Sequence, residues 1–155
     1  MVGVSTMVPH REVVDRARRS RLRAHLAQLD YLRSLNEARV LGVSQTEIAR
    51  ELRVTQPAIS KSMSAASSTP PVPEGFHGGS PYEIAERYAA GEISREVLVD
   101  ELARWPYTPR DAGDGIDWLT YEPGTFEDVV RARRDGLLDT ATYDAVLARQ
   151  DELER

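Results

Sequence analysis

Apolar side chains recur at helical spacing, with polar side chains between them, in residues 44–63, SQTEIARELRVTQPAISKSM. Ile59 falls on one face of a predicted short helix, which leaves Gln56, Ser60 and Lys61 on the other face. Glutamine pairs bidentately with adenine, while a lysine or a hydroxyl reaches guanine or a phosphate. This polar face therefore has the chemistry needed to read base edges in a DNA major groove.

Two predicted short helices would hold these side chains in place. Ser44 and Glu47 have the spacing of a capping box for the first helix, Thr55 is the predicted cap of the second, and Pro57 suits its first turn. Ala49 must be small because the second helix crosses close to it. The positions expected to face inward are Ile48, Ala49, Leu52, Val54, Ile59 and Met63.

The segment resembles the helix-turn-helix of bacterial transcriptional regulators, whose recognition helices often begin as TQPAISK does here. The resemblance spans about twenty residues and implies sequence-specific binding of double-stranded DNA. Arg53 stands where many members have glycine, so either the turn is looser or Arg53 reaches the DNA backbone. The alternative is a capped helical hairpin without a DNA-binding role. The DNA-contact candidates are Gln45, Arg53, Thr55, Gln56, Ser60 and Lys61.

A long helix is predicted over residues 11–41, which contain no proline or glycine, and Gly42 would end it. Its leucines recur at spacings of three and four, at Leu22, Leu26, Leu29 and Leu32. This stripe either packs inside the chain or pairs with a second copy. A homodimer is expected, since two-fold symmetry doubles the DNA site.

Arginines crowd the start of that helix, at Arg11, Arg16, Arg18, Arg19, Arg21 and Arg23. They are able to clamp DNA phosphates, and Arg16, Arg19 and Arg23 are the candidates for backbone contact. The alternative is a solvated helix face, since Glu12 and Asp15 neutralise part of the charge.

Charge divides the chain into two parts. Residues 1–66 hold eleven Lys/Arg and six Asp/Glu, a net charge of +5, whereas residues 67–155 hold nine and nineteen, a net charge of −10. Four prolines, three glycines and three serines gather in AASSTPPVPEGFHGGSP at this boundary. We therefore expect a DNA-binding domain over 1–66, a linker over 67–80 that holds two reorienting modules apart, and an acidic module over 81–155.

The second half predicts helices at about 81–90, 94–105, 125–135 and 140–153. No alternating strand pattern appears anywhere, so the expected fold class is all-α. A faint repeat places Gly91 before the cap Ser94 and Gly136 before the cap Asp139, so each copy should build the same turn between two helices.

Large aromatic residues stand beside turn residues in this acidic half. Trp105, Tyr107, Trp118 and Tyr121 are candidates for anchoring a protein partner, or else they close the module's own small core. Nearby carboxylates would steer a basic partner towards them.

A basic DNA-binding half, a linker and an acidic half form a layout that resembles the antitoxins of toxin–antitoxin pairs. That resemblance implies a chain that represses its own operon and neutralises a toxin through residues 81–155. The alternative is a stand-alone repressor whose second half binds another regulator or itself.

Other classes of function find little support. Cysteine is absent, the three histidines lack a metal-ligand spacing, and no glycine-rich phosphate loop or nucleophile with a histidine base occurs, so we expect no metal, no cofactor and no catalysis. His77 is expected to sit in a mobile tether. Without a signal peptide or an apolar run of ~20 residues, a cytoplasmic location and no membrane partner are expected.

Overall fold

A computed structural model describes residues 9–108 and 124–155, and within these ranges it contains seven helices and no strand. The expected all-α fold class is confirmed for this part of the chain. The helices are α1 His10–Val40, α2 Gln45–Leu52, α3 Gln56–Ser67, α4 Pro81–Ala89, α5 Arg95–Arg104, α6 Glu127–Arg134 and α7 Thr140–Leu153.

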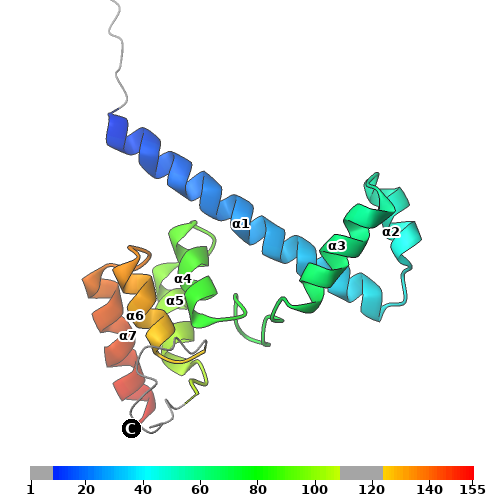
Figure 1. The fold of residues 1–155 in the computed structure, drawn as a ribbon. Helices are drawn as coiled ribbons and strands as arrows, with labels where there is room; N and C mark the ends of the chain where they lie inside the picture. Colours follow the sequence, from blue (N-terminus) through cyan, green and yellow to red (C-terminus); the bar gives the residue numbers. More distant parts are fainter. Residues whose placement is uncertain (1–8, 109–123) are drawn as a thin grey trace, which may run out of the picture.

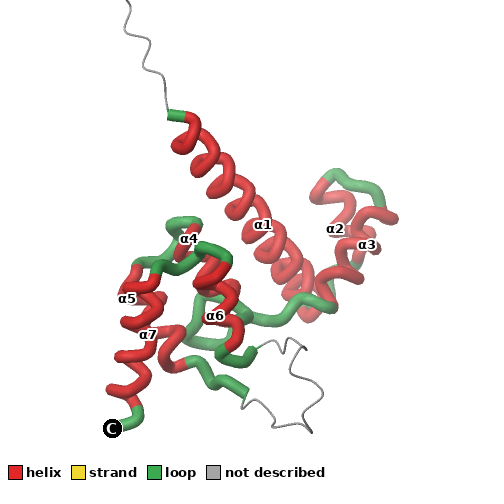
Figure 2. Tube along the Cα trace, turned by 60° about the vertical axis from the view of Figure 1, so that its left-hand side comes forward, coloured by secondary structure: helices red, strands yellow, loops and turns green. Residues whose placement is uncertain are grey.

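α1 is the spine of the molecule. Its 31 residues extend for about 46 Å at 1.5 Å per residue. α2 and α3 pack beside its C-terminal end, whereas α4 to α7 lie on its other side (Figure 1, Figure 2). One helix therefore carries both halves of the chain.

α2 and α3 form the expected pair of short helices. The hydroxyl of Ser44 accepts a hydrogen bond from the Glu47 N–H at 3.1 Å, and that of Thr55 accepts one from the Ala58 N–H at 3.3 Å, so both predicted caps are confirmed. A small apolar core joins this pair to α1, made of Leu32, Leu35, Ile48, Ala49, Ile59, Met63 and Ala66.

Two of the positions expected to face inward are wrong. Leu52 is 48% exposed and Val54 is 42% exposed. Leu52 is the last residue of its helix and lies at the open edge of a shallow groove between α1 and α2, and Val54 follows in the turn. α1 packs mainly on α3 and hardly contacts α2, so the C-terminal end of α2 and the turn after it stay exposed.

α4 to α7 form two helical hairpins that pack together, with α4 against α6 and α5 against α7. The repeat builds the same turn twice. Gly91 and Gly136 both take a positive φ, of 82° and 81°, and the side chains of Ser94 and Asp139 then cap the next helix. The shared core consists of Ile84, Ala85, Leu98, Leu102, Val129, Ala132, Leu138 and Val146.

The segment between α3 and α4, where the linker over 67–80 is expected, makes contacts with both halves of the chain. The Arg33 Nε donates to the Pro70 carbonyl at 3.0 Å, and an Arg104 N–H donates to the Gly75 carbonyl. Phe76 lies edge-on to Trp105, with 4.9 Å between ring centroids. Arginine donors from both halves thus bind carbonyls of a proline-rich segment that lacks regular backbone partners of its own.

α1 and α4 are joined by a network of ion pairs around two buried side chains, Glu83 and Arg87. Arg33 donates to both carboxylate oxygens of Glu83, at 2.9 and 2.6 Å. Arg87 binds Glu83 at 3.1 Å, Asp30 at 2.7 Å and Glu92 at 2.7 Å. The side chains of Glu83 and Arg87 are each only 8% exposed, so this contact is a built interface between the two halves.

The leucine stripe of α1 packs inside the chain. Leu26 and Leu32 are buried and Leu22 and Leu29 are half-buried. Leu26 and Leu32 therefore follow the first of the two alternatives, and Leu22 lines a groove beside α4.

Candidate nucleic-acid interface

α3 presents a polar face to solvent. Ile59, Met63 and Ala66 are buried on its inner side, whereas Gln56, Ser60 and Lys61 are exposed. Within the described residues, none of these three side chains has a hydrogen bond or ion pair. The inner face fixes the helix in position, and the outer face keeps its donors and acceptors available.

The N-terminal ends of the two short helices add further polar side chains. Gln45 is the first residue of α2 and is exposed. Thr55 is exposed as well, but its oxygen accepts the cap hydrogen bond from Ala58, which leaves the hydroxyl proton to donate. Both residues therefore have a polar atom to offer a ligand that lies across α3.

Arg53 closes the turn between α2 and α3 in a left-handed conformation, with φ 57° and ψ 41°. Of the described non-glycine residues it alone has a positive φ, which explains why a glycine suits this position. The turn is not loose, because the Val54 N–H donates to the Ala49 carbonyl at 3.0 Å. The arginine side chain is exposed and has no ion pair within the described residues.

The arginines of α1 differ in what they contact. Arg16 and Arg19 are exposed and have no partner within the described residues. Arg23 donates through Nε to the Ala90 carbonyl at 3.0 Å, where it caps the end of α4. Arg23 therefore binds within the chain, whereas the side chains of Arg16 and Arg19 remain available to a ligand.

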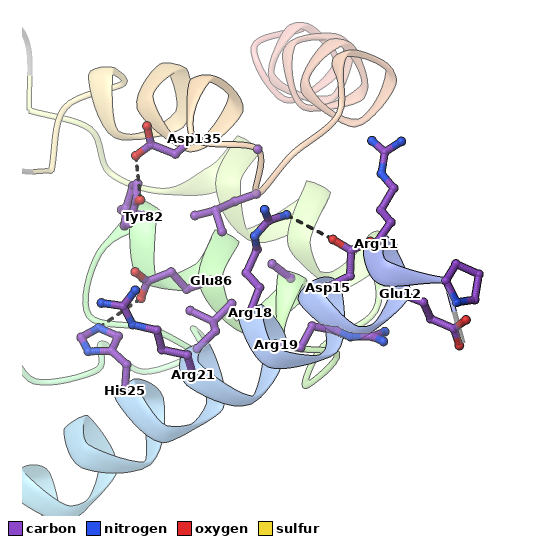
Figure 3. Close-up of a pocket in the computed structure, with 15 residues that line it drawn as sticks. Arg11, Glu12, Asp15, Arg18, Arg19, Arg21, His25, Tyr82, Glu86 and Asp135 are labelled. Carbon is purple, nitrogen blue, oxygen red and sulfur yellow. Dashed lines mark hydrogen bonds and ion pairs between the residues drawn. The ribbon is translucent and has the colours of Figure 1, made fainter. Parts of the chain in front are cut away.

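A groove of about 960 Å³ separates the first half of α1 from α4 and the turn between α6 and α7 (Figure 3). Its walls carry both signs of charge. His25 lies 3.5 Å from Glu86, and the Tyr82 hydroxyl donates to Asp135 at 2.8 Å. Burial and the Asp135 hydrogen bond raise the pKa of Tyr82 to about 12, and burial also raises the pKa of Glu86.

Sequence reasoning did not anticipate this groove, nor the network around Arg87. Both need α1 to lie against α4, and the charged partners are about fifty residues apart in sequence. No local signal pairs them. The arginines of α1 indicate a positively charged helix, but the sequence does not show which element lies opposite them.

The predicted partner anchors are placed inside the acidic module where they are described. Trp105 packs on Phe76, and Tyr107 packs on Phe126 with 5.3 Å between centroids. The Tyr107 hydroxyl donates to the Leu102 carbonyl, and burial raises its pKa. These two residues close the module's own core, and Trp118 and Tyr121 lie outside the described residues.

His77 does not sit in a mobile tether. Its backbone N–H donates to Glu101 at 3.1 Å, and its Nδ1 lies 2.5 Å from the other oxygen of the same carboxylate. Glu101 is 2% exposed, so this pair fastens the segment before α4 to α5.

In comparisons with known proteins, no family model, no curated protein and no solved structure matched this chain. None of the helices in the described ranges is both long enough and apolar enough to cross a membrane.

Proposed function

We propose that this chain is a sequence-specific regulator of transcription that binds double-stranded DNA by inserting α3 into the major groove. The observation that carries the proposal is the exposure of Gln56, Ser60 and Lys61 on a helix whose opposite face is fixed in a core. Because the core fixes the backbone of α3 before DNA binds, only the side chains of this face have to be ordered on binding.

The side chains divide the work by type. Gln56 pairs with adenine and Lys61 with guanine or phosphate, while Gln45, Arg53 and Thr55 hold the sugar–phosphate backbone on either side. The +5 charge of residues 1–66 adds a salt-dependent attraction that does not depend on sequence. By occupying a promoter in the cytoplasm, the chain represses it, and a homodimer would read two half-sites.

A gel shift with DNA from the chain's own promoter region tests the proposal. We expect Gln56→Ala plus Lys61→Ala to weaken binding by about 10-fold to 100-fold, as the loss of one good base contact does. The matched control is Gln150→Ala plus Arg134→Ala on α7 and α6, which also removes one amide and one positive charge and should leave binding unchanged. Binding that survives the first pair as well as the second would defeat the residue assignment.

We also propose that residues 81–155 bind a basic protein, with a toxin as the specific candidate. The net charge of −10 over residues 67–155 favours this role through electrostatic steering. Co-expression of the full chain with the product of the adjacent gene tests it, because an antitoxin co-purifies with its toxin at moderate salt. Failure to co-purify leaves the alternative of a stand-alone repressor whose acidic half binds another regulator or itself.

A further inference from the structure

The first half of α1 is an exposed helical arm. All residues from Pro9 to Arg21 are exposed, and the arm extends past the rest of the fold (Figure 1). We define the basic arm as residues 10–23, which hold six arginines against Glu12 and Asp15. A helix this exposed gains little from packing, so its charge is its main property.

The arm has two sides with different surroundings. Residues on one side, including Leu22 and His25, line the groove against α4. At 100° per residue, Val13, Ala17 and Ala24 lie on the opposite side and continue the row of α1 that packs on α2 and α3. That row consists of Tyr31, Leu35 and Ala38. This opposite side, which we call the open side, is therefore the side of α1 on which α2 and α3 lie.

Charge is distributed unevenly between the two sides. Glu12 and Asp15, the only carboxylates of the arm, both line the groove. Arg16 and Arg21 flank the open side, Arg21 also forming the rim of the groove, and neither has an ion pair within the described residues. The open side is thus bounded by guanidinium groups and carries no carboxylate.

Distance along α1 fits a second contact with the same duplex. Arg21 and Arg16 precede Leu32, where α1 meets the α2–α3 core, by about 16 and 24 Å at 1.5 Å per residue. One turn of B-DNA spans about 34 Å. A duplex that takes α3 into its major groove and runs alongside α1 would therefore bring backbone phosphates within reach of the arm.

We propose that Arg16 and Arg21 bind backbone phosphates of DNA that flanks the α3 site, so that each chain covers more DNA than its recognition helix alone. This inference rests on the proposed function. It keeps Arg16 of the earlier candidates and leaves out Arg23, which is bonded to Ala90, and Arg19, which lies farther round α1 from the open side than Arg16 and Arg21 do. Two phosphate contacts should raise the slope of log affinity against log salt by about 1.8.

Fluorescence anisotropy of the full chain tests the inference with two duplexes from its own promoter region. One duplex ends at the protected sequence, and the other is extended by about 10 base pairs, one helical turn, on each side. Wild-type protein should bind the extended duplex more tightly and with the steeper salt slope. Arg16→Ala plus Arg21→Ala should abolish that gain in affinity and in salt slope, whereas the short duplex should lose only the long-range attraction of two positive charges.

Arg11→Ala plus Arg19→Ala is the matched control, since it removes the same charge from the groove side of the same helix and should keep the gain. Alanine favours helix, and circular dichroism checks that α1 is retained. Equal losses for both pairs, no loss for either, or equal wild-type affinity for the two duplexes overturns the inference while the proposed function stands. Arginine-dependent self-association without DNA also overturns it, and a wild-type chain that binds neither duplex overturns both proposals.

Discussion

α1 makes two contacts of opposite chemical character. Against α3 it packs apolar side chains, with Leu32 and Leu35 beside Ile59, and within the described residues one side-chain hydrogen bond joins the two helices, from the Asn36 amide to the Ala66 carbonyl at 2.6 Å. Against α4 it uses Arg33 and a shared set of buried ions. Within the same stretch of α1, one face is therefore held by hydrophobic burial and another face by ion pairs.

The difference matters for what each contact specifies. Hydrophobic burial is non-directional, so the α3 contact tolerates small shifts of the helices. The bidentate pair of Arg33 and Glu83 fixes both distance and orientation, and Arg87 is held by three carboxylates at once. We infer that the acidic module has one defined position on α1, in contrast to the independent motion that the proline-rich segment suggests.

The largest expected effect comes from Arg87→Ala, which breaks the ionic contact. It removes one of the two arginines that bind the buried Glu83, which keeps Arg33 and the Gly79 backbone N–H as partners, so we expect a loss of about 3 kcal/mol, the lower end of the cost of breaking a buried pair. Urea denaturation should show this loss, and hydrogen exchange should speed up in α4 and the middle of α1 while α3 keeps its protection. Arg134→Ala, at an exposed position, should change stability by less than about 0.5 kcal/mol.

The reciprocal change is Ile59→Ala, which weakens the apolar contact. Ile59 is fully buried, and truncation of a buried isoleucine costs about 2–5 kcal/mol. Exchange should speed up in α2 and α3 but not in α4 to α7, and DNA binding should weaken because the recognition helix loses its support. Equal loss of protection in both halves would show that the two contacts do not separate the molecule in this way.

The sequence predicts one of these contacts far better than the other. The caps at Ser44, Thr55, Ser94 and Asp139 and the positive-φ glycines are local features, and the helices they bound match the structure closely. The apolar contact follows from helical periodicity, apart from Leu52 and Val54 at its edge. Because these signals are local, the sequence was enough to predict the helices and the exposed face of α3.

The ionic contact could not be predicted because its members are far apart in sequence. Arg33 and Glu83 are 50 positions apart, and Arg87 and Asp30 are 57 apart. An arginine on a predicted helix surface has the same pattern whether it meets water, phosphate or a buried carboxylate. The proline-rich composition between the halves then favoured separation, whereas the bonds of Arg33 and Arg104 hold that segment in place.

Arg53→Gly tests the turn between α2 and α3, which belongs to the half of the molecule held by the apolar contact. A non-glycine residue in the left-handed region costs about 1–2 kcal/mol, and glycine's extra freedom in the unfolded chain offsets part of the gain, so we expect stability to rise by about 0.5–1 kcal/mol. If Arg53 also binds the DNA backbone, affinity falls while stability rises. Thermal denaturation and a gel shift on the same variant measure the two effects. A decrease in stability would mean that the arginine side chain supports the turn.

The smallest effect is a dependence of the ionic contact on pH, because two neighbouring carboxyls of α4 respond in opposite directions. Burial opposes the charged form of Glu83, but Arg33 and Arg87 outweigh it and hold its pKa below the ordinary value. Its contribution is present above the unfolded pKa and is lost as pH falls through the folded one. Burial raises the pKa of Glu86, so its contribution is present at low pH and is lost as pH rises through its folded value.

Urea midpoints measured from about pH 7 to about pH 3 separate the two carboxyls. Glu83→Gln should lower stability near neutral pH and have less effect at the acid end, where the native carboxyl is itself losing charge. Glu86→Gln should raise stability near neutral pH, because it removes a charge that burial disfavours, although it also removes the contact with His25 at 3.5 Å. If the two variants showed the same pH profile, Arg33 and Arg87 would not be holding the pKa of Glu83 below that of Glu86. The contact of α1 with α4 would then not depend on the ion pairs of Glu83.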